Sequence, residues 1–268
     1  MTAAATLAEA LAPFRADPAR SAILLDVDGT LAPIVRHASD AHVPEATRAL
    51  LINVARRYGL VACVSGRRAS DARRVVSIGS ITYVGSHGSE VLRPGATEPK
   101  IDPEVASWAR RVQEFTAQES AADLHRLRVR IEDKGVMSAF HWRGAPDEAA
   151  GEAAVREIAE RAERAGLAPH WGRKVLEVRP PVRIDKGVGV VALLRESRVD
   201  HALYVGDDNT DLDAFRGLEE LAESGRLTTA LRIGVSSDEG PSELAEAADL
   251  MVDGPTGVRA VLETLLES

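Results

Sequence analysis

Short runs of consecutive apolar residues alternate along this chain with longer segments in which apolar residues recur every three or four positions. The runs are predicted to be buried strands, and the periodic segments between them are predicted to be helices. The predicted strands are 22–26, 60–64, 81–84, 201–205 and about 229–235, and the predicted helices begin at Pro44 or cover 69–77, 187–196, 210–216 and 256–266. Near-continuous apolar strands that alternate with helices are typical of a parallel sheet covered by helices on both faces.

The middle of the chain follows a different pattern. Two helices are predicted there, at 102–121 and 147–165, together with two pairs of strands, 126–132 with 136–143 and 167–171 with 173–179. The sequence Asp133-Lys134-Gly135 between the first two strands is a hairpin signal. Hairpins that interrupt a parallel-sheet pattern indicate an inserted second domain. We therefore expect a core formed by 1–99 and 183–268 and a smaller inserted α/β domain formed by 100–182.

Composition excludes several classes of function. The formal net charge of −8 disfavours binding to nucleic acid or to an anionic membrane. The single cysteine, Cys63, lies in an apolar run, so no disulfide can form within the chain. No stretch reaches the ~18 apolar residues of a membrane span, and the first twenty residues lack the apolar core of a signal peptide. We expect a cytoplasmic enzyme with a small-molecule substrate; the sequence does not determine its oligomeric state, and a monomer is compatible with it.

Two acidic runs follow two of the predicted parallel strands. Asp26-Val27-Asp28-Gly29-Thr30 ends the first strand, and Gly206-Asp207-Asp208-Asn209-Thr210-Asp211 follows strand 201–205. Functional groups of such sheets gather at the carboxyl ends of the strands, so we expect these carboxylates to converge. Clustered carboxylates repel one another unless a hard cation lies between them, and Mg²⁺ is the usual occupant of a small, all-oxygen site. A carboxylate beside that cation can attack phosphorus.

The two aspartates of the first run are expected to have different roles. We expect the side chains of Asp26 and Asp28 to point to opposite sides of the strand end, so one can attack while the other handles a proton. Gly29 permits a sharp exit from the strand, and Thr30 can donate to a phosphate. The alternative is an ordinary Asp-Gly turn. The second run could likewise cap the following helix, although three carboxylates exceed what a cap needs.

Three further segments carry candidate residues. Ser65-Gly66-Arg67 follows strand 60–64 and can offer a hydroxyl and a backbone N–H to phosphate, although a plain turn would have the same sequence. His87 lies in the glycine-rich loop after strand 81–84, where a structural histidine is the more common case. Lys186 precedes a helix, where a positive charge is mildly unfavourable, and this favours a functional role over a solvated lysine.

These segments occur in the order of the motifs of the haloacid dehalogenase superfamily of phosphotransferases, which the chain resembles: DxDGT, a serine at a strand end, a lysine before a helix, and GDDxxD. The resemblance implies a Rossmann-like catalytic core with an inserted cap domain. It also implies that Asp26 forms an aspartyl-phosphate and that Asp28 protonates the leaving oxygen and then activates water. Ser65 and Lys186 would hold the phosphoryl oxygens. Mg²⁺ would be bound by Asp26, Asp28 (through its carbonyl) and Asp207, supported by Asp208 or Asp211.

The inserted segment carries a mixed set of charged residues around its hairpins. Glu132, Lys134, His141, Arg143 and Glu177 combine acids and bases, which suits a ligand whose hydroxyls both donate and accept. The strings IEDKG (131–135), HWR (141–143) and GRKVLEVRP (172–180) resemble the cap of trehalose-6-phosphate phosphatases. Two strings of the core, DVDGTLAPI (26–34) and GSHGSE (85–90), resemble the same family. The resemblance spans roughly residues 22–255.

The resemblance to that family implies a substrate, trehalose 6-phosphate, and a set of residues that bind it. In the inserted domain these residues are Glu132, Lys134, Arg143 and Glu177, and in the core they are Gly66, Arg67 and His87. Trp142 and Arg173 depart from residues common in the family. Trp142 is expected to pack in the cap, and Arg173 is left out of the site because it does not keep the geometry of lysine.

Two alternatives stay open. The first keeps the chemistry but changes the ester to sucrose phosphate or a mannosylglycerate phosphate. The second is a catalytically silent module that binds a sugar phosphate. A pure binder does not need a paired nucleophile and acid, so the intact pair Asp26 and Asp28 argues against it.

Overall fold

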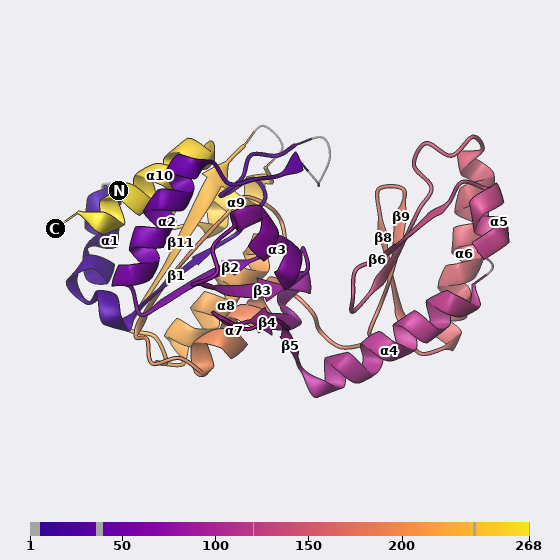
Figure 1. The fold of residues 1–268 in the computed structure, drawn as a ribbon, viewed down its shortest axis with the longest axis horizontal. Coiled ribbons are helices and arrows are strands. Elements are labelled where there is room, and N and C mark those ends of the chain that lie inside the picture. The colour runs from indigo at the N-terminus through magenta and orange to yellow at the C-terminus, as the bar shows by residue number, and fades with distance from the viewer. Residues whose placement is uncertain (1–5, 36–39, 120, 238–239, 268) are drawn as a thin grey trace. The chain divides into compact units, whose positions relative to one another are not determined.

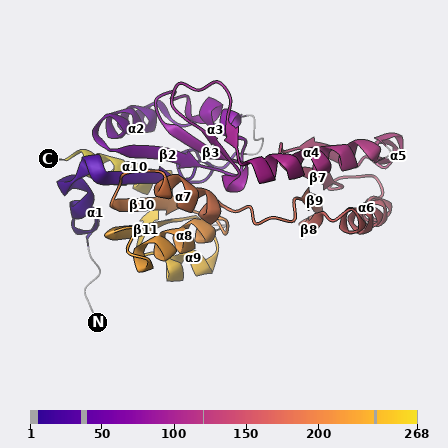
Figure 2. The same cartoon turned by 90° about the horizontal axis from the view of Figure 1, so that it is seen from below.

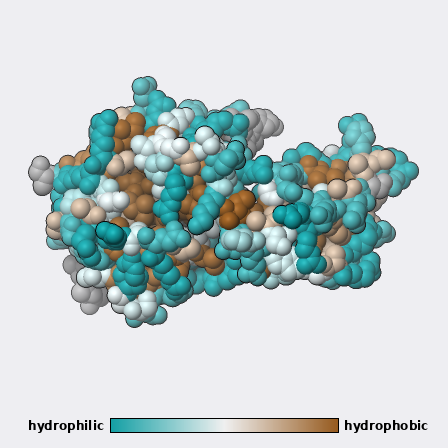
Figure 3. Space-filling model, turned by 60° about the horizontal axis from the view of Figure 1, so that its bottom comes forward, coloured by the Kyte–Doolittle hydropathy of each residue, from teal (hydrophilic) through white to brown (hydrophobic). Residues whose placement is uncertain are grey.

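The computed structural model describes residues 6–35, 40–119, 121–237 and 240–267, and the chain divides into two compact units (Figure 1). The first unit comprises Met1–Lys100 and Ile184–Ser268, and the second comprises Ile101–Arg183. Hydrophilic side chains cover most of the face of both units that Figure 3 displays. Among the described residues, no helix is long and apolar enough to cross a membrane.

The first unit is built on an eight-stranded sheet with the order β12-β11-β10-β1-β2-β3-β4-β5. The strands are β1 (Ser21–Leu25), β2 (Leu60–Val64), β3 (Thr82–Gly85), β4 (Glu90–Leu92), β5 (Lys100–Ile101), β10 (His201–Gly206), β11 (Thr229–Ser236) and β12 (Leu250–Asp253). From β12 to β3 each neighbouring pair is parallel, whereas β4 is antiparallel to β3. The parallel α/β core predicted from the sequence is therefore confirmed.

Helices cover both faces of this sheet (Figure 2). They are α1 (Leu7–Ala16), α2 (Glu45–Arg57), α3 (Ala69–Val76), α7 (Lys186–Arg195), α8 (Asp211–Glu223), α9 (Ser242–Ala247) and α10 (Gly254–Leu266). Strand β1 shows why both faces are apolar. Its residues Ile23 and Leu25 belong to the core beneath α1, α2 and α10, and the alternate residues Ala22 and Leu24 belong to the core beneath α7 and α8. A strand buried on both sides has no polar face, which explains the unbroken apolar runs in the sequence.

The second unit is a four-stranded antiparallel sheet with helices on one face (Figure 1). The strands, in the order β6-β7-β9-β8, are β6 (Arg130–Asp133), β7 (Ser138–His141), β8 (Ala168–Gly172) and β9 (Val175–Arg179), and the helices are α4 (Pro103–Gln118), α5 (Ala121–Arg126) and α6 (Glu148–Arg164). The cross-strand partners Phe140 and Leu176 lie in the core with Val112 of α4 and Val155 of α6. Alternation then places His141 and Glu177 on the face that the helices leave open.

The strand predicted for 126–132 is wrong over its first half. Arg126 ends helix α5, Arg128 takes a left-handed conformation with φ of 58°, and the strand begins only at Arg130. Val129 is buried among the helices, but Ile131 is 36% exposed because β6 is the edge strand of its sheet. The alternation of apolar residues in this segment therefore arises from a turn and a short strand.

Candidate active site

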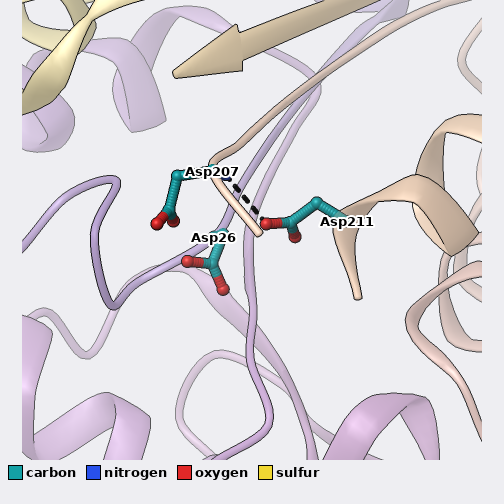
Figure 4. A group of neighbouring side chains, drawn as sticks. All are labelled: Asp26, Asp207 and Asp211. Atoms are coloured by element: carbon teal, nitrogen blue, oxygen red, sulfur yellow. Dashed lines mark hydrogen bonds between the residues drawn. The ribbon is translucent and has the colours of Figure 1, made fainter. Parts of the chain in front are cut away.

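Acidic side chains from two distant segments meet at the carboxyl ends of β1 and β10 (Figure 4). The two strands are parallel neighbours with Leu25 opposite Val205, and the N–H of Asp26 donates to the carbonyl of Val205 at 2.9 Å. Carboxylate oxygens of Asp26, Asp207 and Asp211 lie within 4.8 Å of one another. The structure thus brings the two acidic runs together, and among the described residues these three form a group that could hold a metal ion.

Lys186 supplies the positive charge inside this cluster. It is the first residue of α7 and only 2% exposed, and its Nζ donates to Oδ1 of Asp26 and to Oδ1 of Asp211, each at 2.7 Å. Burial disfavours the charged lysine, but Asp211 and Asp26 outweigh it and raise the pKa of Lys186. Burial also raises the pKa of Asp26, and Lys186 opposes that rise. The buried charges are therefore stable only as a set.

Asp211 is fully engaged within the protein. Its Oδ1 accepts hydrogen bonds from Lys186 and from the hydroxyl of Tyr204 at 2.6 Å. Its Oδ2 accepts from the backbone N–H groups of Asp207 at 2.9 Å and Asp208 at 3.0 Å. A carboxylate has about four acceptor positions, and here four donors occupy them. Asp211 is thus placed to fix the turn that carries Asp207 and to hold Lys186.

Asp207 keeps an oxygen turned toward the N-terminal run. Its Oδ1 accepts from the hydroxyl of Thr30 at 3.0 Å, and a Cβ built on Gly29 would lie 2.0 Å from its Oδ2. Only glycine fits at position 29, where φ is also +88°. Burial, followed by the nearby charge of Asp211, raises the pKa of Asp207 to about 6. A bound cation would favour the ionised form of such a carboxyl.

The remaining acidic residue of the second run has a structural role. Oδ1 of Asp208 accepts from the N–H of Thr210 at 2.8 Å and its hydroxyl at 2.6 Å, and from the N–H of Asp211 at 3.2 Å. These bonds cap the start of α8, so the capping interpretation of the sequence applies to Asp208.

Asp28 faces a different partner from Asp26, as expected, but strand alternation is not the cause, because it would place residues two apart on the same face. The chain leaves β1 after Leu25, and the turn that follows separates the two side chains. Both of its oxygens accept from Arg67: Nε donates to Oδ2 at 2.7 Å and an Nη donates to Oδ1 at 2.7 Å. This is a bidentate pair, which fixes the orientation of the carboxylate. Arg67, predicted to contact substrate, therefore also holds the predicted acid.

The loops after β2 and β3 lie together beside this pair. Ser65 is 1% exposed, its Oγ accepts from the N–H of Arg67 at 3.1 Å, and its carbonyl accepts from the N–H of His87 at 3.2 Å. A Cβ on Gly66 would come within 2.7 Å of the His87 ring. His87 is in the left-handed region with φ of 56°, between Ser86 and Gly88, which are also left-handed. This backbone strain is typical of a functional loop.

Two buried polar residues of the site, Glu90 and Tyr204, were not predicted from the sequence. Glu90 is 5% exposed, and its Oε1 accepts from the N–H of Ala69, which begins α3, and from the hydroxyl of Ser86 at 3.2 Å. Tyr204, the partner of Asp211, stands within an apolar strand. The only signal for Glu90 was its place in the string GSHGSE, and Tyr204 gave none that separates it from core residues.

The predicted sugar-binding residues of the second unit form two groups on the open face of its sheet. In the first group, Nζ of Lys134 donates to Oε1 of Glu177 at 2.7 Å, and Arg179 binds Oε2. In the second group, Glu132 accepts from Nε2 of His141 at 2.8 Å, while Arg143 donates to the carbonyl of Arg173 at 3.1 Å. Ala139 pairs with both Glu132 and Glu177, so the two glutamates lie in one row across β7.

Glu177 makes the stability of the protein depend on pH. Burial opposes its ionisation, but hydrogen bonds from Lys134 and Arg179 lower the pKa of Glu177 from 4.5 to about 2. A depressed pKa contributes stability above the unfolded value and loses it as pH falls through the folded value. We therefore expect Glu177→Gln to lower the free energy of unfolding by up to roughly 3 kcal/mol at pH 6 and by much less near pH 3.

Urea unfolding of wild type and Glu177→Gln across this pH range measures that difference. Glu163→Gln, on the exposed end of α6, is the matched control and should change little at any pH. A constant difference between wild type and Glu177→Gln from pH 6 to pH 3 would contradict the assigned pKa of Glu177.

Comparisons with known proteins agree with this geometry. The sequence model of the trehalose-phosphatase family matches residues 24–255. "Probable trehalose-phosphate phosphatase D" of Arabidopsis thaliana is 29% identical over 247 residues, which cover 86% of this chain and 67% of that protein. The trehalose-phosphate phosphatase of Mycobacterium marinum (strain ATCC BAA-535 / M) is 35% identical over 202 residues, covering 73% of this chain and 51% of that protein. The chain thus spans about half to two thirds of the length of these curated relatives.

A solved structure shares the fold over nearly the whole chain. The C-terminal domain of C. albicans trehalose-6-phosphate phosphatase superimposes with a TM-score of 0.71 at 22% identity, and the match covers 98% of this chain and 99% of that one. At this identity the likeness shows the fold alone.

Proposed function

Because the chain belongs to the trehalose-phosphatase family, we propose that it hydrolyses trehalose 6-phosphate to trehalose and inorganic phosphate with the help of Mg²⁺. One observation carries the chemistry. Asp26 and Asp207 lie side by side at the carboxyl ends of β1 and β10, with the buried Lys186 in contact with Asp26. A nucleophile, a place for a hard cation and a fixed positive charge are the parts that phosphoryl transfer requires.

The residues at the site fit Mg²⁺. The structure offers a carboxylate oxygen each of Asp26 and Asp207, and the family resemblance adds the backbone carbonyl of Asp28. Oxygen donors of this kind suit a hard divalent cation. The family resemblance implied that Asp208 or Asp211 supports these ligands. Since donors from the protein already fill the carboxylate of Asp211, and Asp208 caps α8, we assign both to support the ligands. Mg²⁺ would supply positive charge to the phosphoryl oxygens while the phosphoryl group is transferred from the sugar oxygen to Asp26.

The reaction proceeds in two steps at Asp26. An oxygen of Asp26 attacks phosphorus, the bond from phosphorus to the sugar oxygen breaks, and Asp28 gives that oxygen a proton. Asp28, now ionised, takes a proton from water as the water attacks phosphorus, and the bond from Asp26 to phosphorus breaks. Free phosphate leaves, and both carboxyl groups return to their starting states.

Three other residues serve this sequence. Arg67 orients Asp28 through the bidentate pair. The hydroxyl of Ser65 accepts one hydrogen bond and still carries its proton, which it can donate to a phosphoryl oxygen. Lys186 holds Asp26 and offers its charge to the phosphoryl group. Gly66 and His87, packed against each other, line the core side of the substrate site.

In this proposal the second unit binds the sugar part of the substrate. Residues 100–182 form the cap, and residues 1–99 and 183–268 form the catalytic core. Glu132, Lys134, Arg143 and Glu177 bind the hydroxyls of the disaccharide, because their paired charges offer both donors and acceptors on the open face of the sheet. The buried, unpaired thiol of Cys63 is compatible with the cytoplasm, which stays our expectation.

Phosphate release across a panel of esters tests the proposal. The panel contains trehalose 6-phosphate, sucrose phosphate, a mannosylglycerate phosphate and p-nitrophenyl phosphate, each assayed with Mg²⁺ and with a chelator. The proposal requires the highest kcat/KM for trehalose 6-phosphate and its loss without the metal. A higher value for another sugar phosphate would support the first alternative, and metal binding without any release would support the silent module.

Glu177 should separate sugar recognition from chemistry. Glu177→Gln removes a charge that would bind sugar hydroxyls, so we expect kcat/KM for trehalose 6-phosphate to fall by about ten- to a hundredfold. The value for p-nitrophenyl phosphate should change by less than about threefold, because that ester has no sugar for the cap to hold. Glu163→Gln again serves as the control, and equal losses on both substrates would contradict the role of Glu177.

A further inference from the structure

The second unit contains a cavity of about 590 Å³ whose wall carries four arginines. The residues that line it are Arg128, Arg130, His141, Arg143, Arg173 and Val175. Its volume is within the usual range for small-molecule sites, roughly 300–1,000 Å³. Four guanidinium groups around one cavity are unusual in a chain with a net charge of −8.

The residues that line the cavity come from three turns and from one row of cross-strand partners in the sheet. Arg130, His141 and Val175 are cross-strand partners on the open face of β6, β7 and β9. Arg128 lies in the turn before β6, Arg143 follows β7, and Arg173 lies in the turn between β8 and β9. An Nη of Arg143 donates to the carbonyl of Arg173 at 3.1 Å, which ties two of these turns together.

The protein compensates the charges of this cavity only in part: Glu132 pairs with His141 and Arg130, and the charge of Glu148 acts on Arg143. Within the described ranges, the ion pairs closer than 4.0 Å include Arg130 with Glu132 at 3.6 Å but none that involves Arg128, Arg143 or Arg173. Elsewhere in the same unit, cations such as Lys134 have a carboxylate at 2.7 Å. Like charges around one space repel, and an anion between them would remove the repulsion.

The backbone around the cavity is also strained. Arg128 and Lys174 have φ of 58° and 59°, in the region that favours glycine. A side chain there costs of order 1 kcal/mol or more. The two strained positions are Arg128 itself and the residue that follows Arg173. Guanidinium groups suit phosphate, because its oxygens match their paired N–H donors.

We propose that this cavity binds a phosphate oxyanion, either a phosphate ester or pyrophosphate. It lies on the same sheet face as the group of Lys134, Glu177 and Arg179, in which one carboxylate is bonded by both cations. The phosphate group could come from the proposed substrate, captured before hydrolysis, or from a separate effector anion. The proposal concerns binding and does not depend on the proposed activity.

The tryptophans provide a local readout. All three, Trp108, Trp142 and Trp171, lie in the second unit. Intrinsic fluorescence of the full chain, without Mg²⁺ and at low salt, can therefore follow a titration with pyrophosphate. The test variant combines Arg128→Asn with Arg173→Gln, because asparagine tolerates a left-handed backbone. The control variant combines Arg110→Gln with Arg164→Gln, which removes the same charge from exposed positions on α4 and α6.

We expect a saturable fluorescence change in wild type and in the control variant, with Kd values that agree within about twofold and rise with salt. The test variant should have a Kd about tenfold higher or more, while retaining its near-ultraviolet circular dichroism. An unchanged Kd in the folded test variant, or no saturable response in wild type, would overturn the proposal.

A second titration separates the two sources of phosphate. It uses trehalose 6-phosphate and, for comparison, trehalose, with Asp26→Asn as the background to prevent hydrolysis. If the cavity receives the substrate, the Kd for trehalose 6-phosphate, but not that for trehalose, should depend on Arg128 and Arg173. If the cavity receives an effector, only the Kd for pyrophosphate should depend on them, and either result supports an anion site.

Discussion

Asp26→Asn is expected to reduce turnover of trehalose 6-phosphate by on the order of 10⁴-fold or more, as replacement of the nucleophile does in other covalent enzymes. The amide has the shape of the carboxylate but cannot form the bond to phosphorus that the two-step reaction needs. Asp26 is buried and lies 2.7 Å from Lys186, so the substitution also removes one of the negative charges that hold this lysine. Phosphate release at saturating substrate and Mg²⁺ measures the effect.

A control for this substitution should remove one carboxylate charge near the site from a residue that does not bond to phosphorus. Asp208→Asn matches the loss of charge in a neighbouring turn but not the burial, since the side chain of Asp208 is 54% exposed and its Oδ1 lies 3.8 Å from Nζ of Lys186. It should lower activity far less than Asp26→Asn. Residual activity of Asp26→Asn within about a hundredfold of wild type, in a folded protein, would rule out Asp26 as the nucleophile.

Lys186→Met should destabilise the protein by about 3–5 kcal/mol and abolish activity. The lysine is 2% exposed and contacts Asp26 and Asp211, so its removal leaves buried carboxylates without a counter-charge. These carboxyl groups can avoid the cost by taking up protons. The loss in free energy of unfolding, measured by urea without Mg²⁺, should therefore be larger at about pH 8 than at about pH 5.

Lys174→Met is the matched control for Lys186→Met. Lys174 also contacts a carboxylate, Glu148, but its side chain is 46% exposed. An exposed pair of this kind contributes at most about 1 kcal/mol. Equal losses for the two variants would contradict the claim that Lys186 neutralises a buried cluster.

The parallel core was predictable because its central strands, β1, β2, β3 and β10, are buried on both faces. Residues such as Ile23 and Leu24 belong to opposite cores, so the strand carries an apolar run that local sequence reveals. The position of Asp26 and Asp207 followed from the same pattern, since strand ends in a parallel sheet lie at one edge. The short edge strand β6 was misplaced because a turn with Val129 buried mimics an alternating strand.

Pairings between distant residues could not be predicted from local pattern. The contacts of Arg67 with Asp28 and of Tyr204 with Asp211 depend on how the loops are folded, and nothing in the spacing of these residues specifies a partner. The same holds for the cavity in the second unit. Arg173 was set aside in the sequence because it replaces a lysine, and only the register of β7, β8 and β9 brings its turn near Arg130 and Arg143.

The central claim is that Asp26 bonds transiently to phosphorus, and a variant that stalls the second step tests it most directly. Asp28→Asn removes the group that activates water, whereas p-nitrophenyl phosphate has a leaving group that needs little help from an acid. With Mg²⁺ present, this variant should release one burst of p-nitrophenol and retain a phosphoryl group. Mass spectrometry of the acid-quenched protein should locate that group on Asp26. A burst of p-nitrophenol with no phosphoryl group on Asp26, or with the group on another residue, would contradict the account.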